Sequence, residues 1–168
     1  LAKYKISEDI VVPLSKMNQL LDEVEKITLR YGVRTCAFGH AGDGNLHPNI
    51  SFDRRNPGEL ARVLAAGVEI LEACVAAGGV ITGEHGIGSE KRDFMGLVFS
   101  DADLDAMKRL RAAFDPDGVC NPEKIFPATR FCAESRIEIG CVNEKFLNSH
   151  SGSSSSSFSN SLRTSKDV

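Results

Sequence analysis

Glycine and histidine are concentrated in two short segments of this chain, residues 39–49 and 83–88, which contain three of its four histidines and six of its 15 glycines. Glycine lets a backbone turn tightly. Histidine nitrogens and carboxylate oxygens are ligands for borderline divalent metals. A fold that bends at both segments would bring these side chains to one point, and this requirement constrains the fold more than any other feature of the sequence.

The first segment places His40 and His47 on opposite arms of a bend that contains two glycines and Asp43. A bend that joins two strands can direct both imidazoles at one ion. The alternative interpretation is that Gly-Asp-Gly-Asn forms only a hairpin turn with incidental histidines. Asp43 is another possible ligand, although an aspartate in such a turn more often caps its own backbone.

The second segment contains Glu84 and His85, which follow a short apolar run at residues 80–82. Neighbouring residues on a strand point to opposite faces, so both side chains reach one site only at a strand end, where the backbone bends. Binding residues commonly project from such positions. We therefore predict a metal site formed by His40, His47 and Glu84. We predict that His85, beside this site, carries a proton.

The composition argues against several classes of protein. Hydrophobic residues make up 42% and charged residues 26% of the 168 residues, which suits a single domain with its own core. The net charge is −3 and the lysines and arginines are scattered, so no nucleic-acid-binding surface is expected. The apolar runs are too short to span a bilayer. The glycines of residues 83–88 lack the spacing of a dinucleotide-binding loop.

The five cysteines form no CxxC pair and are odd in number, which argues against a disulfide framework and against a thiolate zinc site. We expect reduced thiols and therefore a reducing compartment, such as the cytoplasm or an organelle matrix. The first residue is leucine rather than methionine. We expect the chain to be part of a longer polypeptide.

The apolar pattern predicts six elements in the order β-α-β-β-α-β. This is the split, ferredoxin-like arrangement of the α+β class, in which an antiparallel sheet carries both helices on one face and leaves the other face free. In the third predicted strand, the period of two places His47 and Asn49 on the same face. The predicted strands are residues 10–12, 33–38, 45–52 and 80–82, and the predicted helices run from the N-cap Ser15 to Gly32 and from Asn56-Pro57 to residues 78–79.

A further helix is predicted at residues 101–113, where apolar residues recur at helical spacing. Residues 149–157 are nearly all serine, which cannot bury enough apolar area to offset the cost of ordering the chain. We expect residues 145–168 to be disordered. The predicted organisation is therefore one domain, residues 1–130, followed by a C-terminal extension, residues 131–168.

Several motifs of this chain, in the same order, resemble the C-terminal part of FAD-linked 2-hydroxyacid oxidoreductases of the vanillyl-alcohol oxidase type. This family includes the glycolate oxidase FAD subunit, D-lactate dehydrogenase and D-2-hydroxyglutarate dehydrogenase. The ending Phe-Cys-Ala-Glu at residues 131–134 resembles the glycolate oxidase subunit in particular. The other motifs are the two segments above, residues 9–13 (Asp-Ile-Val-Val-Pro), residues 114–118 (Phe-Asp-Pro-Asp-Gly) and residues 121–124 (Asn-Pro-Glu-Lys).

The resemblance implies that the chain forms a ferredoxin-like cap over the flavin, which is held by an FAD-binding domain N-terminal to the cap. It implies that His40, His47 and Glu84 bind a divalent metal, zinc or manganese. His85 matches the proposed base of the reaction.

The resemblance also implies two flavin contacts. Asn121 lies in the segment that returns to the flavin domain, and Asn45 is the second implied contact with the cofactor. At position 123 this chain has glutamate where the family usually has glycine.

The implied reaction is oxidation of a small D-2-hydroxy acid, such as glycolate or D-lactate, to the 2-oxo acid. Asn49 would contact the substrate, and Lys5 or Lys91 would hold its carboxylate. The implied partners are the FAD-binding domain and other subunits of a glycolate oxidase. The alternative class is a non-catalytic metal-binding or partner-binding module that retains the cap fold. Because these 168 residues contain no flavin-binding region, we expect the chain to be inactive alone.

Overall fold

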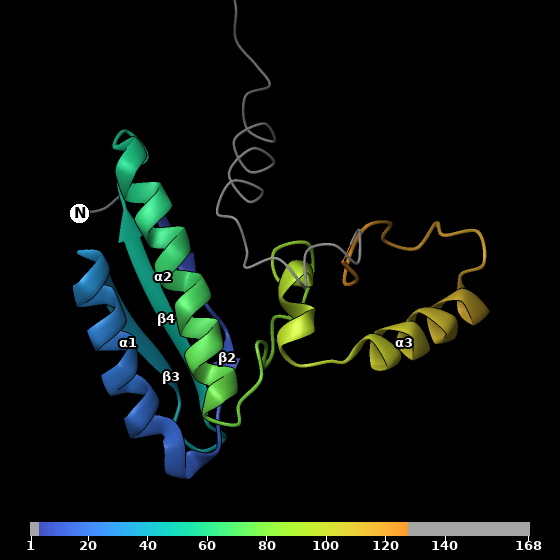
Figure 1. The fold of residues 1–168 in the computed structure, drawn as a ribbon, viewed down its shortest axis with the longest axis horizontal. Coiled ribbons are helices and arrows are strands. Elements are labelled where there is room, and N and C mark those ends of the chain that lie inside the picture. Colours follow the sequence, from blue (N-terminus) through green and yellow to red (C-terminus); the bar gives the residue numbers. More distant parts are fainter. Residues whose placement is uncertain (1–3, 128–168) are drawn as a thin grey trace, which may run out of the picture.

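The computed structural model describes residues 4–127, which form an α+β fold with a four-stranded antiparallel sheet (Figure 1). This confirms the predicted class. The predicted disorder at residues 145–168 and the extension at residues 131–168 lie outside the described residues. The strands are β1 (Tyr4–Ser7), β2 (Ile10–Val11), β3 (Arg34–His40) and β4 (Asn45–Phe52), the helices are α1 (Met17–Tyr31), α2 (Pro57–Ala76) and α3 (Asp101–Phe114), and two 3-10 helices are η1 (Leu14–Lys16) and η2 (Arg92–Leu97).

Strand β4 lies in the middle of the sheet. On one edge it pairs with β3, from Arg34 opposite Ser51 to His40 opposite Asn45. Its other edge pairs first with β1 and then with β2. These two pairings share one register, with Ser7 opposite Asn49 and Ile10 opposite Leu46, so the residues between β1 and β2 also lie beside β4.

Two strand predictions need correction. Strand β1 was not predicted at all, because its run of four residues, Tyr-Lys-Ile-Ser, is short and contains only two apolar side chains. The predicted strand at residues 80–82 is reduced to one antiparallel bridge between Val80 and Val11. The strand predicted at residues 45–52 matches β4, whereas β2 is one residue shorter than the predicted residues 10–12 and β3 runs from Arg34 to His40 instead of residues 33–38.

Helices α1 and α2 lie side by side against the same face of the sheet (Figure 1). Their apolar residues recur at helical spacing and form stripes that pack on the apolar face of β4. The helices and the sheet therefore share one hydrophobic core. Each fully buried aliphatic side chain of this core contributes about 1.5–3 kcal/mol. The core includes Ile10, Leu46, Ile50 and Phe52 from the sheet, Leu20, Val24 and Ile27 from α1, and Val63, Ile70 and Leu71 from α2.

The ends of α1 test the predicted helix limits. Gly32 closes the helix in the left-handed conformation (φ 63°), as predicted. The predicted N-cap is wrong, because Ser15 lies inside η1 and α1 begins only at Met17. The second helix begins at Pro57 after Asn56, as predicted.

Helix α3 lies apart from the sheet, beyond η2 (Figure 1). It begins with a capping box, in which Ser100 accepts a hydrogen bond from the Asp103 amide and the Asp103 carboxylate accepts one from the Ser100 amide. This confirms the helix predicted at residues 101–113. Within residues 4–127, no helix combines the length and the apolar character needed to cross a membrane.

Candidate metal centre

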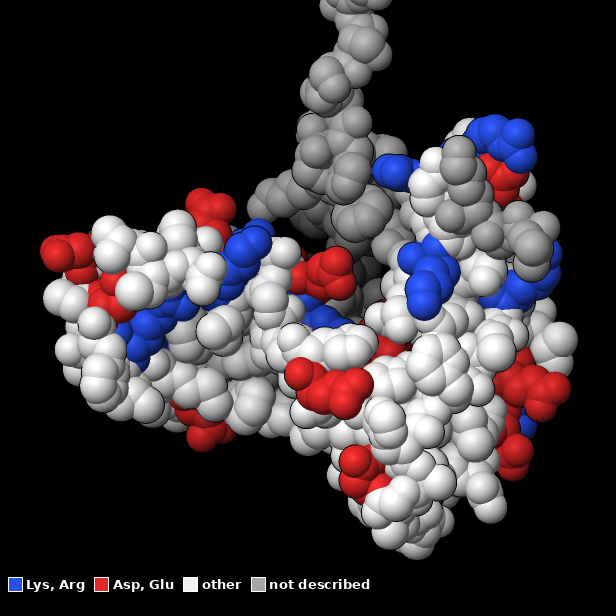
Figure 2. All heavy atoms as spheres, turned by 180° about the vertical axis from the view of Figure 1, so that it is seen from behind, with Lys and Arg blue, Asp and Glu red and all other residues white. Residues whose placement is uncertain are grey.

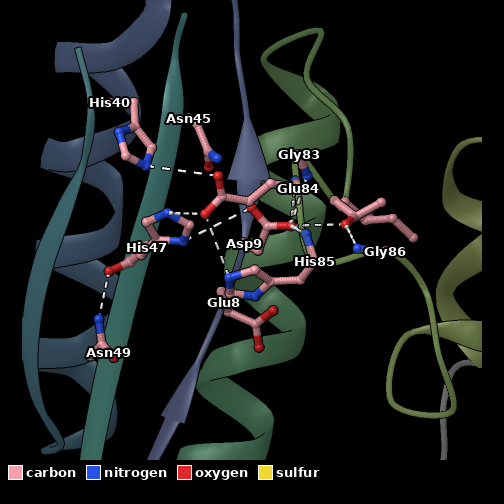
Figure 3. Close-up of polar contacts among 12 residues, drawn as sticks. Glu8, Asp9, His40, Asn45, His47, Asn49, Gly83, Glu84, His85 and Gly86 are labelled. Atoms are coloured by element: carbon pink, nitrogen blue, oxygen red, sulfur yellow. Dashed lines mark hydrogen bonds and ion pairs between the residues drawn. The ribbon is translucent and has the colours of Figure 1, made fainter.

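The candidate centre lies on the face of the sheet opposite α1 and α2 (Figure 3). Because Leu46, Ile50 and Phe52 of β4 point into the core, the period of two directs His47 and Asn49 to this second face. The pairing register adds His40 from β3 to the same face, opposite Asn45. Seen from behind the molecule, acidic and basic residues are interspersed on the surface (Figure 2).

The bend between β3 and β4 depends on two of its glycines. A Cβ atom on Gly39 would collide with the carbonyl oxygen of Asn45, and one on Gly44 would collide with the carbonyl oxygen of Val12. Gly44 also has a φ of 79°, which favours glycine. The glycines therefore let β3 and β4 turn tightly beside β2, as the sequence predicted.

Asp43 caps its own turn, since its Oδ1 accepts a hydrogen bond of 3.0 Å from the Asn45 amide. This agrees with the expected role of an aspartate in such a bend. The hairpin is therefore real, but its histidines are not isolated from the rest of the fold. Both of them approach a carboxylate from the second glycine-rich segment.

That second segment follows Val80 and is held by Asp9. The Oδ2 atom of Asp9 accepts hydrogen bonds from the Thr82 hydroxyl (2.8 Å) and from the amides of Gly83 (2.8 Å), Glu84 (3.0 Å) and His85 (2.8 Å). Burial alone would raise the pKa of this carboxyl, but the four hydrogen bonds outweigh burial and lower it. The backbone bends around the carboxylate, so the side chains of the neighbours Glu84 and His85 lie close together, with His85 Nε2 3.7 Å from Glu84 Oε1.

The carboxylate of Glu84 is the point on which the histidines converge (Figure 3). Its Oε1 lies 3.3 Å from His47 Nε2 and 3.7 Å from His85 Nε2, and its Oε2 lies 3.8 Å from His40 Nε2. The structure therefore brings together all three residues predicted as ligands, together with the predicted base. The His47 side chain is 5% exposed, whereas those of the other three are half exposed, so the cluster opens to the surface on one side.

The donor set and its spacing suit a divalent ion. Two ligands bound at about 2.0–2.1 Å in tetrahedral geometry lie about 3.3 Å apart, close to the separation of His47 Nε2 and Glu84 Oε1. Donor atoms of Asp9, His47, Glu84 and His85 also lie within 4.8 Å of one another, a group that contains the predicted ligands His47 and Glu84 but not His40. Nδ1 of His47 and Oδ1 of Asp9 are buried and have no hydrogen-bond partner among residues 4–127.

Asn49 and Lys5 extend the polar row along the sheet. Lys5 Nζ donates a hydrogen bond of 3.0 Å to Asn49 Oδ1, and Asn49 Nδ2 donates one of 2.8 Å to the His47 carbonyl. The Asn49 amide is therefore oriented by its neighbours. Whether it contacts a substrate stays a prediction.

Lys91 does not have the position expected of a substrate ligand. It is buried, and its ammonium group donates to the carbonyls of Asp9 (2.9 Å) and Ile81 (2.6 Å) and lies 3.4 Å from Glu8 Oε2. These contacts join the segment that follows Val80 to the residues between β1 and β2. The suggestion that Lys91 holds a carboxylate is wrong, because the fold already uses its charge inside the protein.

The two predicted flavin contacts lie in different places. Asn45 is buried beside the cluster, and its Oδ1 has no hydrogen-bond partner within the described chain. Asn121 follows the end of α3 in the chain, and its carbonyl accepts a hydrogen bond from Arg111. Glu123 has a φ of 61°, a conformation that favours glycine.

Asp9 is the residue that sequence reasoning missed. The shared register of β1 and β2 places it opposite His47, but β1 was not predicted, so the register could not be known. One signal was available. The sequence predicts that Ile10 points into the core. Because neighbouring residues of a strand point to opposite faces, Asp9 must then point to the other face, which carries the histidines.

Comparison with known proteins covers this same part of the chain. The family model described as FAD linked oxidases, C-terminal domain, matches residues 2–125, which include the whole Glu84 cluster. This chain belongs to the FAD-linked oxidase family. The described fold is therefore that of the family's C-terminal domain.

Relatives of this FAD-linked oxidase domain are much longer proteins. The glycolate oxidase subunit GlcD of Bacillus subtilis is 45% identical over 121 residues, which are 72% of this chain and 26% of that protein. The mitochondrial D-lactate dehydrogenase (cytochrome) 1 of Saccharomyces cerevisiae is 33% identical over 118 residues, 70% of this chain and 20% of that protein. The chain thus spans about a fifth to a quarter of the length of these relatives.

A solved structure shares the fold. The 4-ethylphenol oxidase from Gulosibacter chungangensis, in its isoeugenol complex, superposes with a TM-score of 0.51 at 16% sequence identity. The match covers 74% of this chain and 25% of that enzyme.

Proposed function

We propose that this chain is the cap domain of an FAD- and metal-dependent oxidoreductase that oxidises a small D-2-hydroxy acid, such as glycolate or D-lactate, to the 2-oxo acid. The observation that carries the proposal is the convergence of His40, His47 and His85 on Glu84. This cluster lies in a chain that is 45% identical to a glycolate oxidase subunit over the same domain.

We infer that the sheet is a ferredoxin-like sheet whose last strand is shortened to the bridge at Val80. In that arrangement both helices cover one face, and the other face is left for a partner domain. Phe38 lies on this second face, beside the His47 ring, and is 57% exposed. An exposed aromatic residue next to the cluster suits a face that a flavin domain covers.

His40, His47 and Glu84 are the residues that would hold the metal, zinc or manganese. When bound, the metal would polarise the substrate hydroxyl as a Lewis acid and the flavin would accept the hydride. Glu84 supplies the negative charge among three imidazoles, so the set combines nitrogen and oxygen donors.

His85 would accept the hydroxyl proton. Its side chain is half exposed, and its Nε2 lies 3.7 Å from Glu84 Oε1, so a substrate bound beside Glu84 comes within reach of the imidazole. A positioned base of this kind contributes about 10²–10⁴-fold to the rate.

Asn49 and Lys5 would bind the substrate carboxylate. The Lys5 ammonium already lies 3.0 Å from Oδ1 of Asn49, and Asn49 lies two residues beyond His47 in β4, on the same face of the sheet. A carboxylate is the natural partner of an ammonium group and an amide N–H. In this arrangement the carboxylate and the hydroxyl of a 2-hydroxy acid would lie side by side along β4.

The experiment joins this chain to the N-terminal part of Bacillus subtilis GlcD, in place of the 26% of that protein that it matches. The fusion should reduce an artificial electron acceptor when glycolate or D-lactate is added, and the matched His85→Ala fusion should do so about 10²–10⁴-fold more slowly. A folded, flavin-loaded fusion that is inactive with both acids would contradict the proposal. It would favour the alternative, a non-catalytic metal-binding or partner-binding module.

A further inference from the structure

Asp9 is a fully buried carboxylate for which the proposed function has no role. Buried carboxylates are rare unless they are paired. This one lies between β1 and β2, directly across from His47 in the shared register of the sheet. Its own carbonyl is held by the buried ammonium group of Lys91, so the residue cannot easily move.

One carboxylate oxygen shapes the loop that carries Glu84 and His85. Oδ2 accepts four hydrogen bonds of 2.8–3.0 Å, one from the Thr82 hydroxyl and three from the successive amides of residues 83–85. Successive amides directed at one anion form a concave backbone nest. The anion here is internal, so it determines the direction in which both side chains leave the backbone.

The other oxygen faces His47. Oδ1 lies 3.9 Å from His47 Nδ1, and neither atom has a hydrogen-bond partner among residues 4–127. An ionised carboxylate only accepts hydrogen bonds, so it favours the imidazole tautomer with its hydrogen on Nδ1. The lone pair then lies on Nε2, the atom 3.3 Å from Glu84 Oε1.

We propose that Asp9 is the positioning residue of this centre: one oxygen shapes the loop of Glu84 and His85, and the other sets the tautomer of His47. Asp9 approaches Nδ1 of His47, whereas Glu84 approaches Nε2. Asp9 therefore acts on the centre through the His47 imidazole, from the side of the ring opposite Glu84. Carboxylates that orient metal-binding histidines in this way are a general feature of metal sites. The inference rests on the proposed metal site and deepens it.

The test compares Asp9→Asn with the matched control Glu8→Gln in the 168-residue chain. The four donors around Oδ2 require an acceptor, so the carbonyl oxygen of the new amide would have to take that place and its NH₂ group would face His47. An N–H donor there favours the tautomer with its hydrogen on Nε2, which blocks the lone pair. Glu8 is the adjacent buried acid, but it contacts Lys91 and not the cluster.

Two measurements are made at pH 8. Long-range ¹H–¹⁵N NMR of the metal-free chain reports the His47 tautomer, and competition with a chromophoric chelator reports the affinity for Zn²⁺. The wild type and Glu8→Gln should carry the hydrogen on Nδ1. Asp9→Asn should move it to Nε2 and bind Zn²⁺ about 10–100-fold more weakly.

A folded Asp9→Asn chain with the wild-type tautomer and the wild-type Zn²⁺ affinity would overturn the proposal. If Asp9→Asn does not fold, the wild type still decides, because a hydrogen on Nε2 of His47 would overturn it equally. A wild type that shows the Nδ1 hydrogen but does not bind Zn²⁺ would refute the metal site of the proposed function. It would support the control of His47 by Asp9.

Discussion

The imidazole of His47 is stacked on that of His85, with ring centroids 5.2 Å apart and planes inclined by 15°. Both rings direct Nε2 toward the same Glu84 oxygen. The two histidines differ in exposure, since the His47 side chain is 5% exposed and that of His85 is 52% exposed. Burial suits His47 to the role of a fixed metal ligand, and exposure suits His85 to the exchange of a proton with a substrate.

Glu84→Gln should weaken the binding of Zn²⁺ by more than about 100-fold. Removing a residue that only hydrogen-bonds to a metal ligand costs about 10–100-fold in affinity, and changing a direct ligand should cost more. The reason is that an anionic oxygen donor among three histidines becomes a neutral amide. Isothermal titration of the metal-free chain gives the affinity. Unchanged affinity would show that Glu84 is not a ligand.

His85→Ala should keep the metal and lower kcat of the flavin-domain fusion by about 10²–10⁴-fold, the usual contribution of a positioned base. Elemental analysis and steady-state kinetics on one preparation separate the two properties. Loss of the metal would make His85 a ligand. Full turnover would show that the proton is taken by another group.

Gly44→Ala should destabilise the hairpin that carries the histidines, whereas Gly42→Ala should not. A Cβ atom on Gly44 would meet the Val12 carbonyl in a left-handed conformation, while one on Gly42 would meet nothing within 4 Å. The conformational term alone costs about 1–2 kcal/mol. Chemical denaturation of both variants measures the difference, and equal free energies of unfolding would contradict the assigned role of Gly44.

Cys74 should resist alkylation while Cys36 and Cys120, which are exposed, react. Burial raises the pKa of the Cys74 thiol to about 11, so on the order of 0.3% is thiolate at pH 8.5. A raised pKa in the folded state also means that stability falls as the pH rises from about 9 towards 11. Peptide mapping after iodoacetamide treatment tests this, and rapid labelling of Cys74 in the folded chain would contradict it.

The sequence predicted those parts of the fold in which a local pattern decides the structure. The alternation in Asn45–Phe52 located β4 to the residue, and Gly32 located the end of α1. The start of α1 at Ser15 was wrong, because the chain after Pro13 first forms a 3-10 turn. Cap residues alone did not distinguish these two kinds of helix.

Parts that depend on distant contacts could not be predicted. Strand β1 is defined by its pairing with β4, more than 40 positions away, and the positions of Asp9 and Lys5 beside β4 follow from that pairing. Residues 80–82 have the apolar character of a strand, yet only Val80 forms a bridge. The next residues turn instead around the carboxylate of Asp9.

The central claim is that the two glycine-rich segments form one metal site. Titration of the metal-free 168-residue chain with Zn²⁺, in the presence of a competing chelator, tests it most directly. The matched variants are His47→Ala, which removes the buried imidazole, and Asp43→Asn, which changes an acid of the same bend that only caps its turn. The account predicts one tightly bound Zn²⁺ in the wild type and in Asp43→Asn, and loss of that binding in a folded His47→Ala chain. No binding in the wild type, or undiminished binding in His47→Ala, would contradict it.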